Sequence, residues 1–180
     1  MPTLYLIATP IGNLEDISLR ALRILGEVKL IAAEDTRKTR LLLSFYKIKT
    51  PLVSYHEHNK DSKLPHLLKH LEQEDVALVS EAGMPGISDP GYELVLAVIE
   101  RGIPLVAIPG PSVLPTALAI SGLPTNQFLY LGFLPRVRGE RKRLLDSVAS
   151  ESRTMVAFES PHRLRHSLKD ILEALGDRRI

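Results

Sequence analysis

The stretch VALVSEAGMPGISDPG, residues 76–91, runs from a short apolar segment directly into a loop of glycine, proline and small residues. LYLIATPIGNLED at residues 4–16 and LVAIPGPSVLPTALAISGLP at residues 105–124 show the same pattern. An apolar run, a Gly/Pro turn and a helical pattern predict strand, loop and helix, and open α/β sheets bind ligands at the carboxyl ends of such strands. We therefore expect the three loops to form one ligand site, although each alone could be an ordinary turn.

The charge of these loops restricts the ligand. They contain Glu15, Asp16, Glu81 and Asp89 but no lysine or arginine. A P-loop would carry a lysine after its glycines, and a dinucleotide site would carry G-x-G-x-x-G after the first strand, and neither pattern is present. A polyphosphate ligand is thus disfavoured, and a ligand with an uncharged or cationic reactive centre, such as the sulfonium of S-adenosylmethionine, fits better.

Composition limits the class of protein. With 180 residues, 44% of them hydrophobic, the chain can bury a sizeable core in one domain or two small ones. The absence of cysteine excludes disulfides and thiolate metal sites. No apolar run approaches the ~20 residues of a membrane span, and the N-terminus lacks the basic start of a secretory signal, so we expect a cytoplasmic protein. Residues 118–180 carry a net charge of +4 and residues 1–117 a net charge of −2, so the second part is expected to face a polyanion.

Strand and helix patterns alternate along almost the whole chain, which predicts an α/β fold with a mostly parallel sheet covered on both faces. The expected strands are residues 4–8, 28–33, 52–55, 76–80, 104–108, 128–134 and 154–158. The expected helices are residues 17–25 (ending at Gly26), 36–46, 62–73, 92–101, 112–121, 141–149 and 162–175. We place a domain boundary at the turn near Gly122, which gives an N-terminal α/β domain at 1–121 and the start of a second, incomplete α/β domain at 122–180.

Six motifs in one order span essentially the whole chain: TPIGNLEDIS (9–18), AEDTRKT (33–39), SYHEHN (54–59), SEAGMPGISDPGY (80–92), AIPGPS (107–112) and ESPHR (159–163). Together they resemble the ribosomal RNA small subunit methyltransferase I family of the tetrapyrrole methylase superfamily. The resemblance implies 2'-O-methylation of a cytidine of 16S rRNA, near the decoding centre of the small ribosomal subunit, with S-adenosyl-L-methionine as cofactor. It also implies a tetrapyrrole-methylase-like fold of two α/β domains, a homodimer, and family members that continue past residue 180.

The superfamily's cofactor site transfers to this chain by motif. The implied cofactor-binding residues are Pro10, Ala82, Gly83, Met84, Ile87, Ser112, Val113 and Glu159. Met84 departs from the superfamily pattern, because it stands where the Gly-Asp-Pro loop has its acidic residue. For Met84, Ile87 and Val113, packing in the core is the simpler explanation.

Several acids and a histidine follow the second and third expected strands. As catalytic candidates we take Glu34, Asp35, His56 and Glu57 for handling the hydroxyl proton, and Arg37 for positioning a phosphate or carboxylate. Asp35 could equally be a helix N-cap with Glu34 favourably placed near the helix start, and His56-Glu57-His58-Asn59 could be a solvated turn. H-x-H without further ligands is a weak metal pattern, and we expect no metal site.

Two basic segments suit RNA. Residues 136–143 predict contact with RNA phosphates through Arg136, Arg138, Arg141, Lys142 and Arg143, although such a run is often just a solvated face. Arg37, Lys38, Arg40, Lys47 and Lys49 form a second basic stretch with no acid among them. Two alternatives remain open: a small-molecule methyltransferase of the tetrapyrrole type, and a non-catalytic RNA-binding module on the same fold.

Overall fold

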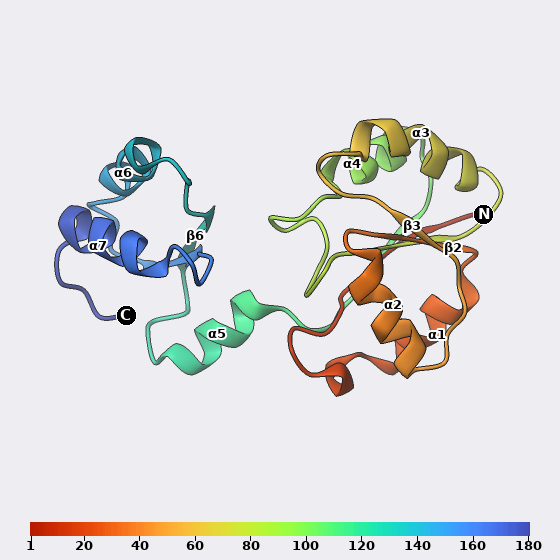
Figure 1. Cartoon of the computed structure of the whole chain (residues 1–180), viewed down its shortest axis with the longest axis horizontal. Coiled ribbons are helices and arrows are strands. Elements are labelled where there is room, and N and C mark those ends of the chain that lie inside the picture. Colours follow the sequence, from red (N-terminus) through yellow and green to blue (C-terminus); the bar gives the residue numbers. More distant parts are fainter. The chain divides into compact units, whose positions relative to one another are not determined.

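The computed structural model describes all 180 residues, which form two compact units, Met1–Val113 and Leu114–Ile180 (Figure 1). The strands are β1 (Leu4–Ile7), β2 (Leu30–Ala33), β3 (Leu52–Ser54), β4 (Val76–Val79), β5 (Leu105–Ile108), β6 (Phe128–Phe133) and β7 (Thr154–Phe158). The helices are α1 (Leu19–Glu27), α2 (Thr36–Phe45), α3 (Lys60–His70), α4 (Tyr92–Glu100), α5 (Val113–Ser121), α6 (Arg138–Ser147) and α7 (Leu164–Leu175), with a short 3-10 turn, η1, at Leu14–Asp16. Every predicted strand and helix is present.

The first unit contains a five-stranded, fully parallel sheet in the order β3-β2-β4-β1-β5. The central strand β4 and its neighbour β2 are buried along their whole length, while the edge strands β3 and β5 are partly exposed. Parallel sheets require cover on both faces, and the expected α/β architecture is confirmed.

Successive residues of each strand face opposite layers of helices. Ile31 and Ala33 pack with α1 and α2, whereas Leu30 and Ala32 pack with α3 and α4. Figure 1 shows these two helix pairs on opposite faces of the sheet. The near-continuous apolar runs of the strands therefore serve two cores at once.

Helix α1 shows where local rules gave a wrong boundary. The helix continues through Gly26 to Glu27 instead of ending at Gly26. Gly26 keeps a negative φ, and Val28, which caps the helix, donates its N–H to Ile24 at 3.0 Å and is 4% exposed. Packing of Val28 in the core therefore outweighs the low helix propensity of a single glycine, which costs about 1 kcal/mol.

The second unit has a parallel pair of strands, β6 and β7, with α6 packed against α7. The predicted domain boundary at residues 121 and 122 lies at the C-terminal end of α5, whereas the compact units divide at its N-terminal end. The domain assignment thus stays a prediction. None of the helices is long and apolar enough to cross a lipid bilayer.

Candidate active site

The loops after β1, β4 and β5 lie side by side at the carboxyl edge of the first sheet, because these strands are neighbours. The backbones of Thr9 and Gly83 exchange two hydrogen bonds of 2.9 Å, which join the first loop to the second. The third loop closes on the first, since a Cβ atom added at Gly110 would lie 3.0 Å from Cβ of Ala8. The prediction that the three loops come together is confirmed.

Gly83 lies where the three loops converge. Its φ of 81° is a left-handed conformation that glycine adopts without steric penalty. A Cβ atom at this position would meet Ile11 of the first loop at 3.6 Å and the carbonyl oxygen of Pro111 of the third loop at 3.8 Å. The first and third loops therefore both come within van der Waals distance of Gly83 in the second loop.

The residues implied to bind a cofactor differ in how exposed their side chains are. Met84 is partly buried and packs against the core on the α3 and α4 side. Ile87 and Val113 are 45% and 47% exposed, so the core-packing alternative is wrong for both. The remaining positions in the first unit are Pro10 and Ser112, partly buried, and Ala82, exposed. The loops thus present accessible apolar side chains beside polar backbone.

The acids Glu34 and Glu81 meet where β2 and β4 end. The helices that follow these neighbouring strands, α2 and α4, lie on opposite faces, and ligands of α/β sheets bind at such switch points. Glu34 Oε2 accepts a hydrogen bond from the backbone N–H of Glu81 at 3.0 Å. Lys38 of α2 forms an ion pair with the Glu81 carboxylate. The three loops themselves contain no cation, but a lysine from α2 lies beside them with its charge neutralised by Glu81.

Asp89, noted from the sequence only as a loop acid, is a titratable group of this region that was not among the catalytic candidates. Burial raises the pKa of the Asp89 carboxyl to about 6; the charges of Glu34 and Glu81 add to the rise, and a hydrogen bond with Ser80 opposes it. Asp89 therefore exchanges its proton near neutral pH. Its place in a Gly/Pro loop was visible in the sequence, but its burial beside two other acids depends on the strand order.

Asp35 is the N-cap of α2, which confirms the alternative interpretation of this residue. Its carboxylate accepts the backbone N–H of Arg37 at 2.8 Å and of Lys38 at 3.4 Å. The Arg37 guanidinium bonds the other oxygen at 2.9 Å, and these contacts lower the pKa of Asp35 to about 2. Such an acid remains ionised at neutral pH, so it is a weak base. The Arg37 side chain stays 87% exposed despite the pair.

His56 and Glu57 follow β3 and lead into α3. Lys60 Nζ lies 2.7 Å from Glu57 and 2.5 Å from Glu93, and hydrogen bonds with both carboxylates raise the pKa of Lys60. Tyr55 is fully buried, and desolvation raises the pKa of its hydroxyl to about 12. Nδ1 of His56 is buried without a hydrogen-bond partner. No three His, Asp or Glu side chains in the chain are arranged to hold a metal ion.

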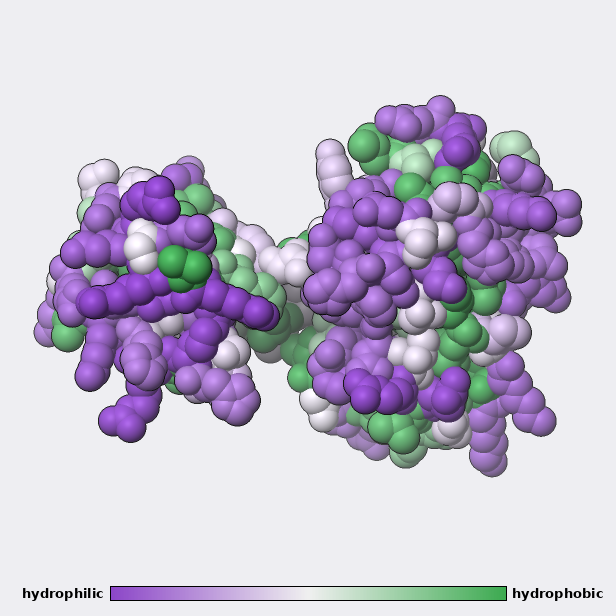
Figure 2. Space-filling model, turned by 45° about the horizontal axis from the view of Figure 1, so that its top comes forward, coloured by the Kyte–Doolittle hydropathy of each residue, from purple (hydrophilic) through white to green (hydrophobic).

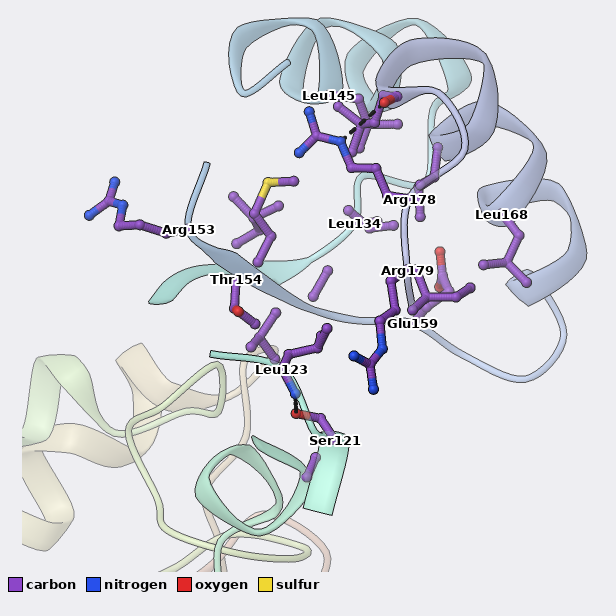
Figure 3. Close-up of a pocket in the computed structure, with 18 of the residues that line it drawn as sticks. Ser121, Leu123, Leu134, Leu145, Arg153, Thr154, Glu159, Leu168, Arg178 and Arg179 are labelled. Atoms are coloured by element: carbon purple, nitrogen blue, oxygen red, sulfur yellow. Dashed lines mark hydrogen bonds between the residues drawn. The ribbon is translucent and has the colours of Figure 1, made fainter. Parts of the chain in front are cut away.

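Glu159 is fully engaged within the second unit. Its carboxylate accepts the Ser160 N–H at 2.6 Å and the Ser167 hydroxyl at 2.5 Å, and it pairs with Arg163 at 2.6 Å. Burial raises the pKa of Glu159, but the hydrogen bonds and the arginine charge outweigh it and hold the pKa below its usual value. Glu159 borders an apolar cavity of about 530 Å³ formed by α5, β6, β7, α7 and the C-terminal residues (Figure 3).

The basic run of residues 136–143 contains one cation that does not fit contact with RNA. Arg141 is 5% exposed, and its Nε and Nη2 lie 2.8 and 2.5 Å from the carboxylate of Asp170 on α7. Arg141 therefore joins α6 to α7 and is not available to phosphate. Arg138 pairs with Asp170 and Glu173. The exposed cations without an ion-pair partner are Arg136, Lys142 and Arg143, on a unit whose visible face in Figure 2 is mainly hydrophilic.

Comparison with known proteins places these features in a family. The family model for tetrapyrrole (corrin/porphyrin) methylases matches residues 3–180. The ribosomal RNA small subunit methyltransferase I of Halalkalibacterium halodurans is 52% identical over 99% of the chain, which spans 62% of that relative's length. The Thermotoga maritima protein of the same name is 51% identical, and the chain spans 81% of its length.

A solved structure agrees on the fold. Diphthine synthase superposes with a TM-score of 0.74 at 14% identity, over 96% of this chain and 71% of that protein. Because this identity is low, the likeness bears on the fold alone. The matched family model and the two relatives together show that the chain belongs to the ribosomal RNA small subunit methyltransferase I family of the tetrapyrrole (corrin/porphyrin) methylases.

Proposed function

We propose that this chain supports S-adenosylmethionine-dependent methylation of a ribose 2'-oxygen on a cytidine of 16S rRNA. Family membership supports the class of reaction and the rRNA substrate. The observation that carries the proposal is the convergence of three loops on Gly83, in the same loop as Glu81 and Asp89, with Glu34 bonded to the Glu81 N–H.

The three loops fit the cofactor that the family implies. S-adenosylmethionine, when bound, supplies a methyl group already activated on a sulfonium. Backbone carbonyls and the nearby carboxylates suit a cation, and the Lys38 charge is neutralised by Glu81. The exposed Ile87 and Val113 offer apolar contact for the uncharged parts of the cofactor. Within the first unit the proposed lining residues are Pro10, Ala82, Gly83, Met84, Ile87, Ser112 and Val113. Glu159 of the second unit remains a proposed lining residue. Because its oxygens are already bonded, it would contact the cofactor through its aliphatic part.

Asp89 and Glu34 are the proposed proton-handling groups. A general base works best when its pKa lies near the working pH, and it contributes roughly 10²- to 10⁴-fold to the rate. Asp89, with a pKa of about 6, meets this requirement better than Asp35, with a pKa of about 2. Glu57 is held by Lys60, which leaves His56 as the further candidate. Arg37 is exposed enough to contact a phosphate of the substrate.

The proposed partner is 16S rRNA within the small ribosomal subunit, which places the protein in the cytoplasm, and a homodimer is the proposed assembly. Arg136, Lys142 and Arg143, together with the partly engaged Arg138, supply phosphate contacts in the second unit. Phosphate contacts of this kind give an affinity that depends on salt concentration but do not select an RNA sequence.

Calorimetric titration with S-adenosylmethionine and transfer of a tritiated methyl group to small ribosomal subunits test the proposal together. We expect binding and label at a cytidine 2'-oxygen. Absence of cofactor binding at millimolar concentration would favour the non-catalytic module. Label on a corrinoid precursor instead of rRNA would favour the small-molecule methyltransferase.

A further inference from the structure

One face of α2 carries cations that nothing in the chain neutralises. Arg40 on the helix, and Lys47 and Lys49 directly after it, are exposed and form no ion pair or side-chain hydrogen bond. Residues 36–50 contain no acid. Arg37 begins the same face at the carboxyl edge of the sheet, next to the proposed active site. Arg37 itself is paired with Asp35, so the unpaired cations begin at Arg40 in the middle of the helix and continue past its C-terminal end.

The same face exposes two large apolar side chains. Leu41 is 71% exposed and Phe45 is 59% exposed. Residues 37, 41, 44 and 45 follow helical spacing and so share one side of α2, opposite the buried Leu42 and Leu43. The centroids of the Phe45 and Tyr46 rings lie 4.9 Å apart in an edge-to-face arrangement, and the Tyr46 hydroxyl donates a 2.8 Å hydrogen bond to the carbonyl of Leu14. Phe45 is thus an exposed ring packed against a tyrosine that is itself held by a hydrogen bond.

A hollow of about 290 Å³ lies at the C-terminal end of this face, between α2 and β3. Arg40 and Lys49 both line it, together with Ser44 and Thr50, and no carboxylate does. The chain turns sharply here, with Lys47 at a φ of 58°, which brings residues on either side of the turn to one hollow. The hydroxyl of Ser44 makes no hydrogen bond within the chain, so it can donate to a ligand. Two cations and a free hydroxyl around a hollow suit a phosphate group.

We propose that the exposed face of α2 and its hollow bind a single-stranded RNA segment adjoining the methylated nucleotide. The inference rests on the proposed function and extends the RNA surface to the first unit. Arg40 and Lys49 hold a backbone phosphate in the hollow, Phe45 stacks on a base, and Arg37 contacts the RNA nearest the reaction. Cations next to an exposed aromatic ring are typical of surfaces that bind single strands, because the phosphates pair with the cations while a base stacks on the ring.

The experiment measures anisotropy of a labelled single-stranded RNA from the target region, titrated with the full chain at several salt concentrations. Each phosphate contact on a single strand contributes a slope of about −0.7 to log K against log salt. Loss of two contacts in Arg40→Ala/Lys49→Ala should flatten the slope by about 1.4 and weaken binding roughly tenfold near 150 mM salt. Phe45→Ala should weaken binding about fivefold or more with the slope unchanged, and Phe45→Tyr should restore it.

The matched control is Lys69→Ala/Arg101→Ala, which removes one exposed lysine and one exposed arginine from the α3 and α4 side of the sheet. It should leave affinity and slope as in the wild type. Circular dichroism checks the folding of each variant.

The inference would be overturned by no RNA binding by the wild type, by an α2 double variant with wild-type affinity and slope, or by an equal loss in the control. Loss of binding only to phosphatidylserine vesicles in the α2 variant would also overturn it and assign the face to an anionic membrane. Titration with S-adenosylmethionine on the same preparations reports on the proposed function separately, since failure there leaves the RNA result standing.

Discussion

The pH dependence of methyl transfer should follow the ionisation of Asp89. If Asp89 accepts the hydroxyl proton, only its ionised form is active. With a pKa of about 6, the wild-type rate should rise with unit slope below pH 6 and level off above pH 7. Replacing Asp89 by Asn removes the base while nearly keeping the shape of the side chain, and should lower the rate roughly 10²- to 10⁴-fold.

The fall in rate between pH 7 and pH 5 distinguishes Asp89 from an acid with an ordinary pKa. At pH 5 a group with a pKa of about 6 is about one-tenth ionised, so the rate should fall about tenfold from its plateau. An acid with the ordinary pKa of 3.8 would still be about nine-tenths ionised at pH 5, so the rate would barely change. Asp35, with a pKa of about 2, lies further still from this range.

Single-turnover transfer of a tritiated methyl group, at saturating cofactor and RNA between pH 5 and 8, provides the measurement. Asp35→Asn is the matched control, since it removes a neighbouring acid of the same type and should keep the acid limb of the wild type. A flat wild-type profile down to pH 5, or an Asp89→Asn rate within threefold of the wild type, would refute the role of Asp89.

Three further outcomes follow from the same contacts. Because the folded-state pKa of Asp89 lies above its ordinary value of 3.8, its ionisation opposes folding, so stability is lost as pH rises between about 4 and 6. The shift corresponds to about 3 kcal/mol, which partial exposure of Asp89 reduces, so Asp89→Asn should gain roughly 1–2 kcal/mol in urea unfolding at pH 7.5 and nothing near pH 4. Asp170→Asn leaves Arg141 buried with a neutral partner and should cost roughly 1–3 kcal/mol, less than deleting the side chain because the Asn amide oxygen still accepts a hydrogen bond; faster hydrogen exchange in α6 and α7 measures it. Gly110→Ala should weaken S-adenosylmethionine binding in calorimetry by pushing the first and third loops apart, whereas Gly26→Ala, with open space around it, should leave affinity unchanged.

Much of the fold could be predicted from local pattern because strand and helix periods differ, and turn residues mark where one gives way to the other. The capping role of Asp35 was also visible, since an acid just before a helical pattern can bond the free N–H groups of the first turn. Gly26 shows the limit of local rules. Its effect on helix α1 was overridden by the burial of Val28, and burial depends on what the rest of the chain brings alongside.

The site shows the same division more clearly. Glu81 was visible as an acid in a loop, but its contacts with Glu34 and Lys38 exist only because β2 and β4 are neighbours. In the sequence Arg141 resembles its basic neighbours, but in the structure it is buried and bonded to Asp170 of α7. A residue's type is local, whereas its partners and its exposure are set by segments distant along the chain.

The amino-acid sequence alone thus determined the order of strands and helices, the three Gly/Pro loops and the family resemblance, because each of these is written in short consecutive stretches. The tertiary structure alone decided that the loops converge on Gly83, that Asp89 is desolvated beside other acids, and that one face of α2 stays open and cationic. The physical reason is that desolvation and charge pairing act through space, and distances in space follow from the strand order and not from sequence separation.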